Sequence, residues 1–234
     1  MASPFVSVSG LRFAWPGAPI PTLEIDAFEI FPGERVFLRG PSGSGKSTLL
    51  GLIAGVLEPQ AGRIEVAGQD LLSLSSARRD MLRADRLGII FQLFNLVPYL
   101  SVIENVALPL RFSKKRRDRV SGSVEIEAKR LLAALGLDDS SLLQRQVIDL
   151  SVGQQQRVAA ARALIGSPDL IIADEPTSAL DTLRRDQFIE LLSVEASKTD
   201  AALLFVSHDP ALAGHFQRAI DLSDINRAQP IEAA

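Results

Sequence analysis

The chain has 234 residues, 47% of them hydrophobic, which is enough to bury the core of one large domain or two modest ones. A formal net charge of −3 and an isoelectric point near 5.5 give no global electrostatic reason to bind nucleic acid, so we expect no nucleic-acid partner. The absence of cysteine excludes disulfides and cysteine-based zinc sites. No apolar stretch reaches the ~20 residues that a membrane-spanning helix needs, so we do not expect the chain to cross a membrane by itself.

The chain begins with a strand-rich region and continues with a helical one. Residues 5–39 alternate or run apolar between turns rich in proline and glycine, which predicts strands, and another short strand is predicted near residue 63. Residues 75–166 follow a mostly helical pattern, interrupted by a strand at 87–91. Two buried-type strands at 170–174 and 203–207 flank a helical segment at 182–197, an order that predicts a parallel sheet.

Two segments of the helical region leave alternatives open. The basic run SKKRRDR at 113–119 is interpreted as a solvated loop, with contact to an anionic membrane surface as the alternative. The apolar residues from Phe91 to Tyr99 form either a dock for a helix of a partner or part of the helical core, and the sequence favours neither. If the segment is a dock, Phe94→Asp would abolish partner binding and leave the activity of the chain intact, whereas loss of folding would favour the core.

A phosphate-binding loop is the strongest motif in the sequence. GPSGSGKST at 40–48 follows the apolar strand VFL and precedes the helix-like TLLGLIAG. Glycines allow backbone N–H groups to curl around an anion, and the following helix directs its positive end toward that anion. Lys46 is expected to reach the β- and γ-phosphates of a nucleotide, and Ser47 to bind Mg²⁺.

Polar residues follow three other predicted strands. Asp174 and Glu175 end the strand LIIAD, where Asp174 suits the Mg²⁺ shell and Glu175 suits a general base for water. His208 follows LLFVS at a strand end that faces the ligand crevice of an α/β sheet, and it is expected to touch the γ-phosphate. Gln92 has the same position after the strand at 87–91, although an isolated glutamine would carry no functional signal.

The segment DLSVGQQQRV at 149–158 is predicted to begin a helix. Ser151 and Gln154 have the spacing of a capping box, as do Ser101 and Glu104. Capping does not explain Gly153, which costs about 1 kcal/mol relative to alanine in a helix unless something must approach the backbone closely. A serine hydroxyl can accept from its own helix and still donate to a phosphate, so capping and anion binding are compatible.

Together and in this order, GPSGSGKST, Gln92, LSVGQQQR, LIIADEP, SALD and His208 resemble the ATP-binding subunit of ABC transporters over essentially the whole chain. The segments around 91–110 and 153–181 are most similar to the branch of lipoprotein release, macrolide export and cell division. The resemblance implies an α/β P-loop fold with a RecA-like core, a small antiparallel β subdomain and a helical subdomain at about residues 93–166. Residues 1–234 would then form a single ATP-binding domain.

The resemblance also implies roles for individual residues. The catalytic residues would be Glu175, His208, Gln92 and Lys46, and the Mg²⁺ ligands Ser47, Gln92 and Asp174. Asp181 would be an acid that faces the dimer partner. Trp15 would be the aromatic residue that stacks on adenine, although physical reasoning alone favours this role and a role as a core anchor of the small sheet equally. The residues expected to contact ATP are Trp15, Gly40, Pro41, Ser42, Gly43, Ser44, Gly45, Lys46, Ser47, Thr48, Ser151, Gly153 and Gln154.

The implied partners are integral membrane permease subunits and a second copy of the chain. Residues 151–154 would close over ATP held by the other subunit, so that two ATP molecules lie in a two-fold dimer. Val152 departs from the family's usual glycine and puts the geometry of closure in question. The chain would be a cytoplasmic protein on the cytoplasmic face of the inner membrane and an ATPase that drives export or lipoprotein release.

Three other functions compete with this interpretation of the sequence. ATP-driven mechanical signalling across the membrane without transport fits the sequence equally well. An ATP-driven clamp on chromosomes or ribosomes would need a long coiled-coil insertion or a second ATPase unit, which this chain lacks. A binding module without activity is disfavoured because all the expected catalytic residues are present.

Overall fold

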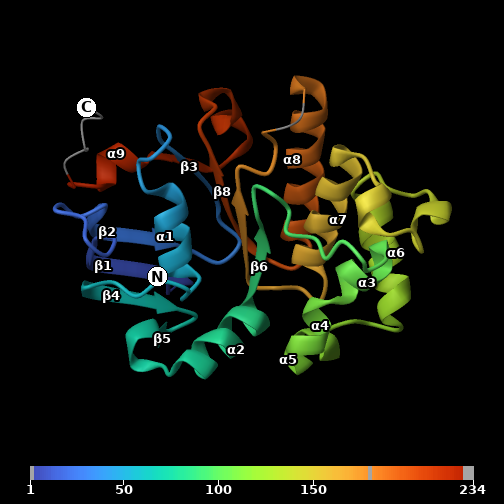
Figure 1. Cartoon of the computed structure of the whole chain (residues 1–234), viewed down its shortest axis with the longest axis horizontal. Coiled ribbons are helices and arrows are strands. Elements are labelled where there is room, and N and C mark those ends of the chain that lie inside the picture. Colours follow the sequence, from blue (N-terminus) through green and yellow to red (C-terminus); the bar gives the residue numbers. More distant parts are fainter. Residues whose placement is uncertain (1–2, 179–180, 229–234) are drawn as a thin grey trace.

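A computed structural model of the chain describes residues 3–178 and 181–228. Two β-sheets lie side by side with helix α1 between them, and most of the remaining helices gather on the opposite side of the larger sheet (Figure 1). In the part of the chain that is described, no helix combines the length and apolar character needed to span a bilayer.

The larger sheet is parallel and has the strand order β6-β7-β8-β3-β9. Its strands are β3 (Arg35–Arg39), β6 (Leu87–Ile90), β7 (Leu170–Asp174), β8 (Ala202–Ser207) and β9 (Arg218–Asp221). Strands β7 and β8 are almost continuously apolar, as expected where helices or another sheet cover both faces of a parallel sheet. The parallel sheet predicted from the strand–helix–strand order is thereby confirmed.

The smaller sheet is antiparallel and has the order β2-β1-β4-β5. Its strands are β1 (Val6–Phe13), β2 (Leu23–Ile30), β4 (Ala61–Val66) and β5 (Gln69–Asp70). Buried and exposed residues alternate along much of β1 and β2, because one face of this sheet packs on the interior and the other meets solvent.

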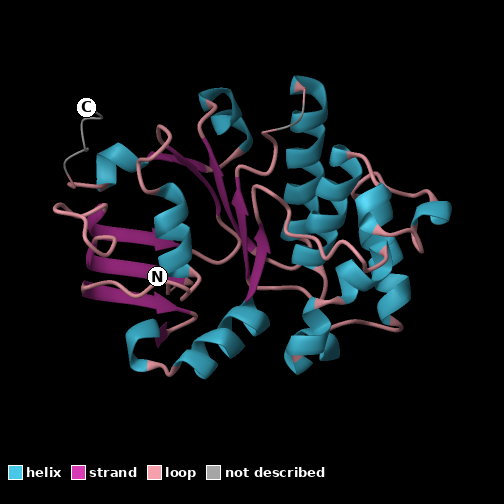
Figure 2. Ribbon diagram, in the orientation of Figure 1, coloured by secondary structure: helices cyan, strands magenta, loops and turns pink. Residues whose placement is uncertain are grey.

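Helices cover both faces of the parallel sheet (Figure 2). The α-helices are α1 (Lys46–Ile53), α2 (Ser76–Arg86), α3 (Val102–Ala107), α4 (Pro109–Phe112), α5 (Lys114–Asp118), α6 (Val124–Ala134), α7 (Val152–Leu164), α8 (Thr182–Ser197) and α9 (Leu222–Ile225). Short 3₁₀ helices lie at η1 (Leu71–Ser73), η2 (Ser140–Leu142), η3 (Val147–Asp149) and η4 (Pro210–His215).

Alternate residues of the parallel strands supply two hydrophobic cores. Along β3, Phe37 faces the core formed with α3, α6, α7 and α8, whereas Val36 and Leu38 face the core formed with α1 and the antiparallel sheet. Strand β8 divides in the same way. The parallel sheet is therefore buried on both faces, and the ends of its strands lie at the edge of this packed core.

Several element boundaries agree with the sequence predictions. Strand β7 and helix α8 span 170–174 and 182–197 as predicted, and both capping boxes are present. Strand β9 was not predicted, because RAID is short and none of its residues is fully buried. It nevertheless extends the parallel sheet beside β3.

The interpretation of residues 113–119 as a solvated loop is wrong. Residues 114–118 form helix α5, and Arg116 is only 2% exposed. Its guanidinium donates to the carbonyl oxygens of Ile165 at 2.9 Å from Nε, of Leu87 at 3.1 Å from Nη1 and of Ala163 at 2.8 Å from Nη2. Burial lowers the pKa of Arg116 to about 10. Arg116 therefore ties α5 to the end of α7 and the start of β6.

A second buried charge joins α6 to α8. The side chain of Glu195 is 4% exposed, accepts from Arg130 Nη1 at 2.9 Å and is also paired with Lys198. Burial raises the pKa of Glu195, but the hydrogen bonds from Lys198 and Arg130 outweigh burial and leave the pKa below its ordinary value. The carboxylate therefore stabilises the fold in its ionised form.

Candidate functional site

The carboxyl ends of four adjacent parallel strands bring most of the predicted polar residues to one edge of the sheet. The phosphate loop follows β3, His208 follows β8, Glu175 follows β7 and Gln92 lies two residues beyond β6. Ligands bind at this edge of open α/β sheets, because the loops there are free to form a crevice. Four motifs that are far apart in sequence therefore share one location.

The loop between β3 and α1 has the backbone conformation of an anion cradle. Gly43 and Gly45 have φ values of 78° and 101°, in the left-handed region that favours glycine. A Cβ on Gly45 would lie 2.8 Å from Leu23 Cδ2, so a side chain at this position would also press against the buried side chain of Leu23. Both the torsion angle and the space at residue 45 thus require glycine.

Hydrogen-bond donors at this loop fit a phosphate group. Gly45 is the N-cap of α1 and offers no side-chain acceptor to the first turn of the helix. Ser44 Oγ is buried and has no hydrogen-bond partner within the described residues. Lys46 is 7% exposed, and its ammonium donates to the loop carbonyl oxygens of Gly40 at 2.7 Å and Pro41 at 2.9 Å. Free donors at a helix start, next to a buried ammonium, are suited to a polyanion.

Ser47 and Asp174 meet across the site. Ser47 Oγ donates to Asp174 Oδ2 at 2.9 Å. Burial raises the pKa of Asp174, the charge of Glu175 raises it further, and Ser47 and Lys46 act in the opposite direction. A hydroxyl and a partly buried carboxylate are oxygen ligands of the kind Mg²⁺ prefers. The described residues hold no cluster of three or more His, Asp or Glu suited to a metal.

Glu175 lies between an ammonium and an imidazole. Its Oε2 is 2.7 Å from His208 Nδ1, and its Oε1 is 3.9 Å from Lys46 Nζ. The φ value of Glu175 is 46°, which is uncommon for a residue with a side chain, and its N–H donates to the carbonyl oxygen of Val206 at 2.9 Å. The neighbouring strand therefore holds Glu175 in a conformation that aims its carboxylate at the site.

Trp15 and Gln92 lie at the periphery of this network. Trp15 is 47% exposed and packs edge-on against Phe13, with ring centroids 5.3 Å apart. Phe13 pairs in register with Leu23, the residue that packs against Gly45, so Trp15 is linked by contacts to the phosphate loop. Its indole is half exposed and available for stacking. Gln92 is exposed at its strand end.

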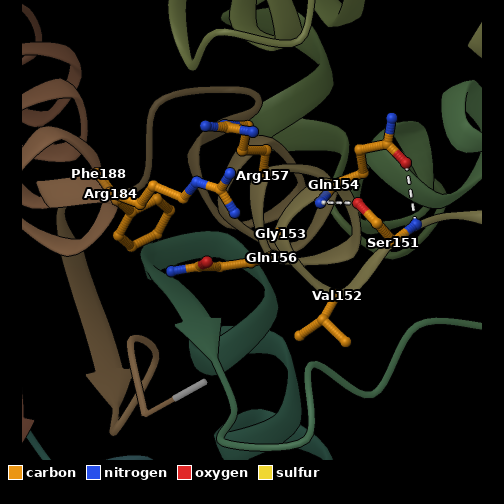
Figure 3. A pocket seen from close by; sticks show the side chains of 8 residues that line it. All are labelled: Ser151, Val152, Gly153, Gln154, Gln156, Arg157, Arg184 and Phe188. Atoms are coloured by element: carbon orange, nitrogen blue, oxygen red, sulfur yellow. Dashed lines mark hydrogen bonds between the residues drawn. The ribbon is translucent and has the colours of Figure 1, made fainter. Parts of the chain in front are cut away.

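Residues 151–154 line a different cavity, of about 540 Å³, which includes no residue of the phosphate loop. Ser151 N donates to Gln154 Oε1 at 2.9 Å, and Gln154 N donates to Ser151 Oγ at 3.4 Å, as Figure 3 shows. Within one chain the two predicted ATP-contacting segments therefore do not form one pocket. The residues that line this cavity are Ser151, Val152, Gly153, Gln154, Gln156, Arg157, Arg184 and Phe188.

Residues from the first two turns of α7 and α8 line this cavity. Arg184 extends from α8 toward the start of α7, near Arg157 and beside the ring of Phe188 (Figure 3). Val152 is 51% exposed at the rim. Two arginines and a helix N-terminus favour an anionic ligand. Sequence reasoning did not single out Arg184, because nothing in the helical pattern of 182–197 distinguishes it from a solvated arginine.

A groove of about 620 Å³ lies between β6, α2, α4 and α7. Phe91, Met81 and Phe112 line it and are 41%, 62% and 72% exposed. Beneath it, Arg162 donates to the carbonyl oxygen of Asn95 at 2.7 Å and to that of Phe94, and burial lowers the pKa of Arg162. The groove is therefore lined partly by exposed apolar side chains and partly by the charged residues Asp80 and Arg83 of α2, and the guanidinium of Arg162 lies at its base.

Segment 91–99 was interpreted either as a dock for a partner's helix or as part of the helical core, and the structure shows both buried and exposed apolar residues in it. Phe94 is 9% exposed and belongs to the core on the helical side of the sheet. Leu93 and Tyr99 are 83% and 74% exposed. The Phe94→Asp test is therefore misplaced, because Phe94 is part of the core and Leu93 is the exposed residue beside it.

A parallel sheet with a phosphate loop after β3, and with acids and a histidine at the neighbouring strand ends, defines a P-loop nucleotide hydrolase of α/β class. A scan for known families identifies the ABC transporter family over residues 23–178. The chain belongs to this family.

Known relatives are similar over most of the chain. The lipoprotein-releasing system ATP-binding protein LolD of Anaeromyxobacter dehalogenans (strain 2CP-C) is 38% identical over 96% of this chain and 92% of its own length. The macrolide export ATP-binding/permease protein MacB of Rhodopseudomonas palustris (strain BisB18) is 37% identical over 96% of this chain, which corresponds to 33% of MacB. Among solved structures, the dimeric ATP-binding cassette MJ0796 in a post-hydrolysis state with ADP and Pi is similar, with 32% identity and a TM-score of 0.83. That match covers 98% of this chain and 100% of MJ0796.

The sequence resemblance is thereby confirmed at the level of family and fold. The chain is the ATP-binding subunit of an ABC transporter, in the branch that contains the LolD and MacB proteins, and it is an ATPase with the α/β P-loop fold of ABC cassettes.

Proposed function

We propose that the network joining Lys46, Ser47, Asp174, Glu175 and His208 is the site of ATP hydrolysis. The observation that carries this proposal is the set of contacts around Glu175 and Asp174, which connects three strand ends through side chains alone. Residues 40–48 bind the phosphates: the loop supplies N–H donors, and Lys46 supplies the positive charge that faces the γ-phosphate.

Ser47 and Asp174 would hold Mg²⁺, with Gln92 added from the neighbouring strand end. When bound, the ion would neutralise charge on the phosphates. Burial raises the pKa of Asp174, and a cation beside its partly buried carboxylate would favour the ionised form.

Glu175 acts as the general base. Its carboxylate orients a water molecule and accepts the proton that the water loses as it attacks the γ-phosphate. His208 fixes the carboxylate through the 2.7 Å contact and presents its other ring nitrogen toward the phosphate. The exposed indole of Trp15 stacks on the adenine, supported from below by Phe13.

Two copies of the chain complete two sites. Ser151, Gly153 and Gln154 lie away from their own phosphate loop, so they contact ATP held by the other subunit, and Asp181 faces that subunit. The hydroxyl of Ser151 accepts from its own helix and donates to the phosphate. ATP closes the dimer because these contacts require the γ-phosphate, and hydrolysis opens it.

The membrane partner is an integral permease, and it binds the groove between β6, α2, α4 and α7. This proposal is supported by the exposed apolar side chains of the groove and by Leu93, which is exposed in the loop that follows Phe91. Residues 1–234 act as one ATP-binding domain with a helical subdomain at about residues 93–166. The dimer lies at the cytoplasmic face of the inner membrane.

The cycle of closure and opening drives the permease in export or in lipoprotein release, the activities that the names of LolD and MacB state for those relatives. ATP-driven mechanical signalling to a periplasmic partner is the alternative, since it uses the same cycle without moving a substrate. Movement of a substrate by the reconstituted transporter would separate the two.

Thiol cross-linking tests the arrangement of the dimer, because the chain has no cysteine of its own. Ser42→Cys and Val152→Cys are introduced into separate chains that also carry Glu175→Gln to slow hydrolysis. A short bifunctional thiol reagent is expected to link the two chains when MgATP is added and not in its absence. Addition of Lys46→Ala to the Ser42→Cys chain should reduce the cross-link. Cross-links that form equally without ATP, or never form, would contradict the arrangement.

A further inference from the structure

His208 is not held in place by packing. It follows the last residue of β8, and its side chain is 60% exposed. Apart from its contact with Glu175, the position of the ring depends on the backbone of the loop that follows β8. The contacts that fix the backbone of this loop therefore determine the position of the imidazole.

Asp209, the next residue, is the anchor of that loop. Its Oδ1 caps η4 by accepting from Ala211 N at 3.0 Å, and its own N–H donates to Ser207 Oγ at 3.2 Å. Its other oxygen, Oδ2, accepts from Nη1 of Arg185. Arg185 belongs to α8, so the loop that carries His208 is tied to a helix that follows a different strand.

Arg185 lies in the first turn of α8, whose N-cap is Asp181. Its N–H donates to the carbonyl oxygen of Asp181 at 2.9 Å. The side chain of Arg185 is 15% exposed and that of Asp209 is 33% exposed, so solvent screens this pair less than an exposed one. The turn that begins at Asp181 is thereby connected through one partly buried ion pair to the residue beside His208.

A second, weaker contact supports the same connection. His215 Nε2, at the end of η4, lies 3.6 Å from Oδ1 of Asp186, the residue after Arg185. The same carboxylate oxygen is 3.5 Å from Nε of Arg185. Helix α8 therefore contacts both ends of the η4 segment, and the Arg185 pair is the contact next to His208.

We propose that Arg185 is a positioning residue for ATP hydrolysis, which holds His208 at Glu175 through Asp209. Through the Arg185–Asp209 ion pair, a movement of the turn at Asp181 also shifts the imidazole of His208. Asp181 is the residue proposed to face the partner subunit. This inference rests on the proposed role of His208 and adds a residue that touches neither nucleotide nor metal.

Two variants remove the pair with little change in shape. Arg185→Gln removes the cation, and Asp209→Asn removes the anion while keeping a side-chain oxygen to cap η4. Each is expected to lower kcat about tenfold, with KM for ATP changed less than about twofold. The double variant should be no slower than the slower of the two single variants, because each of the three variants loses the same Arg185–Asp209 ion pair. Arg185→Lys should recover at least half of the loss on a logarithmic scale, since it keeps the charge.

Lys198→Gln is the matched control. It removes a cation paired with a carboxylate at the other end of α8, far from the loops of the site. Its kcat should equal that of the unmodified chain, and its melting temperature should fall as much as that of Arg185→Gln or more. If Arg185→Gln does not fold, Asp209→Asn and Arg185→Lys carry the same comparison.

A background of His208→Ala separates positioning from general stability. In this background Arg185→Gln should change the residual rate less than about twofold, because its effect passes through the missing imidazole. An equal tenfold loss in both backgrounds, additive effects of the two single changes, or a normal rate in Arg185→Gln would each overturn the inference. If His208→Ala itself hydrolyses ATP normally, the proposed role of His208 fails and the inference with it. If only His208→Ala loses activity, the inference alone fails.

Discussion

Adjacent residues 93 and 94 offer a test that separates the surface for the permease from the core beneath it. Leu93 is 83% exposed and Phe94 is 9% exposed, although both are large apolar residues in the same loop. Aspartate at each position introduces the same charge. We expect Leu93→Asp to leave the fold and ATP hydrolysis intact and to abolish permease binding, whereas Phe94→Asp should prevent folding.

The magnitudes follow from burial. Truncation of a buried phenylalanine to alanine costs about 3–5 kcal/mol, and an unpaired carboxylate in the same place adds to that cost. A domain is stable by only about 5–15 kcal/mol in total, so Phe94→Asp removes most of the free energy of unfolding. Leu93 loses almost no buried area, and a surface change of this kind alters stability by about 0.5 kcal/mol at most.

Urea unfolding followed by circular dichroism gives the free energy of unfolding of each variant, and capture on detergent-solubilised permease gives binding. Ile126→Asp is the control, since Ile126 is 66% exposed on α6 and does not line the groove. It should keep both stability and binding. If Phe94→Asp is as stable as the unmodified chain, the assignment of Phe94 to the core is wrong. If Leu93→Asp binds the permease normally, the docking surface is wrong.

Three further predictions concern stability, the phosphate loop and the start of α7. Glu195→Gln should lower the free energy of unfolding by about 1–2 kcal/mol at pH 7. Because the folded-state pKa of Glu195 is lowered, this difference is present above the ordinary value of 4.5 and should vanish in urea titrations as the pH falls below the folded-state value. Gly45→Ala should weaken ATP binding at least about tenfold by calorimetry, because φ is 101° and the added Cβ presses against the buried side chain of Leu23; normal affinity would refute the loop geometry. Val152→Gly should change the ATPase rate only modestly and Gly153→Asp should abolish it without loss of stability, since an acid in the first turn suits the helix but repels phosphate. The reverse pattern would mean that the segment is only a helix cap.

The sequence predicted the elements that local chemistry determines. The strand at 170–174 is a run of apolar residues, the helix at 182–197 begins at a capping aspartate, and the loop at 40–48 contains glycines at the two left-handed positions of its bend. Each of these is readable without knowledge of the rest of the chain. The family resemblance then joined them into one fold.

Contacts between distant segments could not be predicted in this way. The burial of Arg116 depends on carbonyl groups at Leu87, Ala163 and Ile165, none of which has a signal in the basic run itself. The opposite exposure of Leu93 and Phe94 depends on how the loop turns after β6, with φ of 59° at Phe94. Strand β9 forms because the edge of β3 is available for pairing, and its own four residues carry little strand character.

The same limit applies to the site. Lys46, Ser47, Asp174, Glu175 and His208 were all predicted to act together, and the structure brings them into contact. The pairing of Arg185 with Asp209 joins two residues that are 24 positions apart, and either alone reads as an ordinary surface charge.

ATP hydrolysis and dimer formation by Glu175→Gln, measured side by side, test the central claim most directly. The unmodified chain should hydrolyse ATP slowly and dimerise only transiently with MgATP. Glu175→Gln keeps the shape of the side chain but cannot accept the proton, so turnover should disappear while sedimentation shows a stronger ATP-dependent dimer. Unchanged turnover in Glu175→Gln would contradict the assignment of Glu175 as the general base, and with it the proposed site.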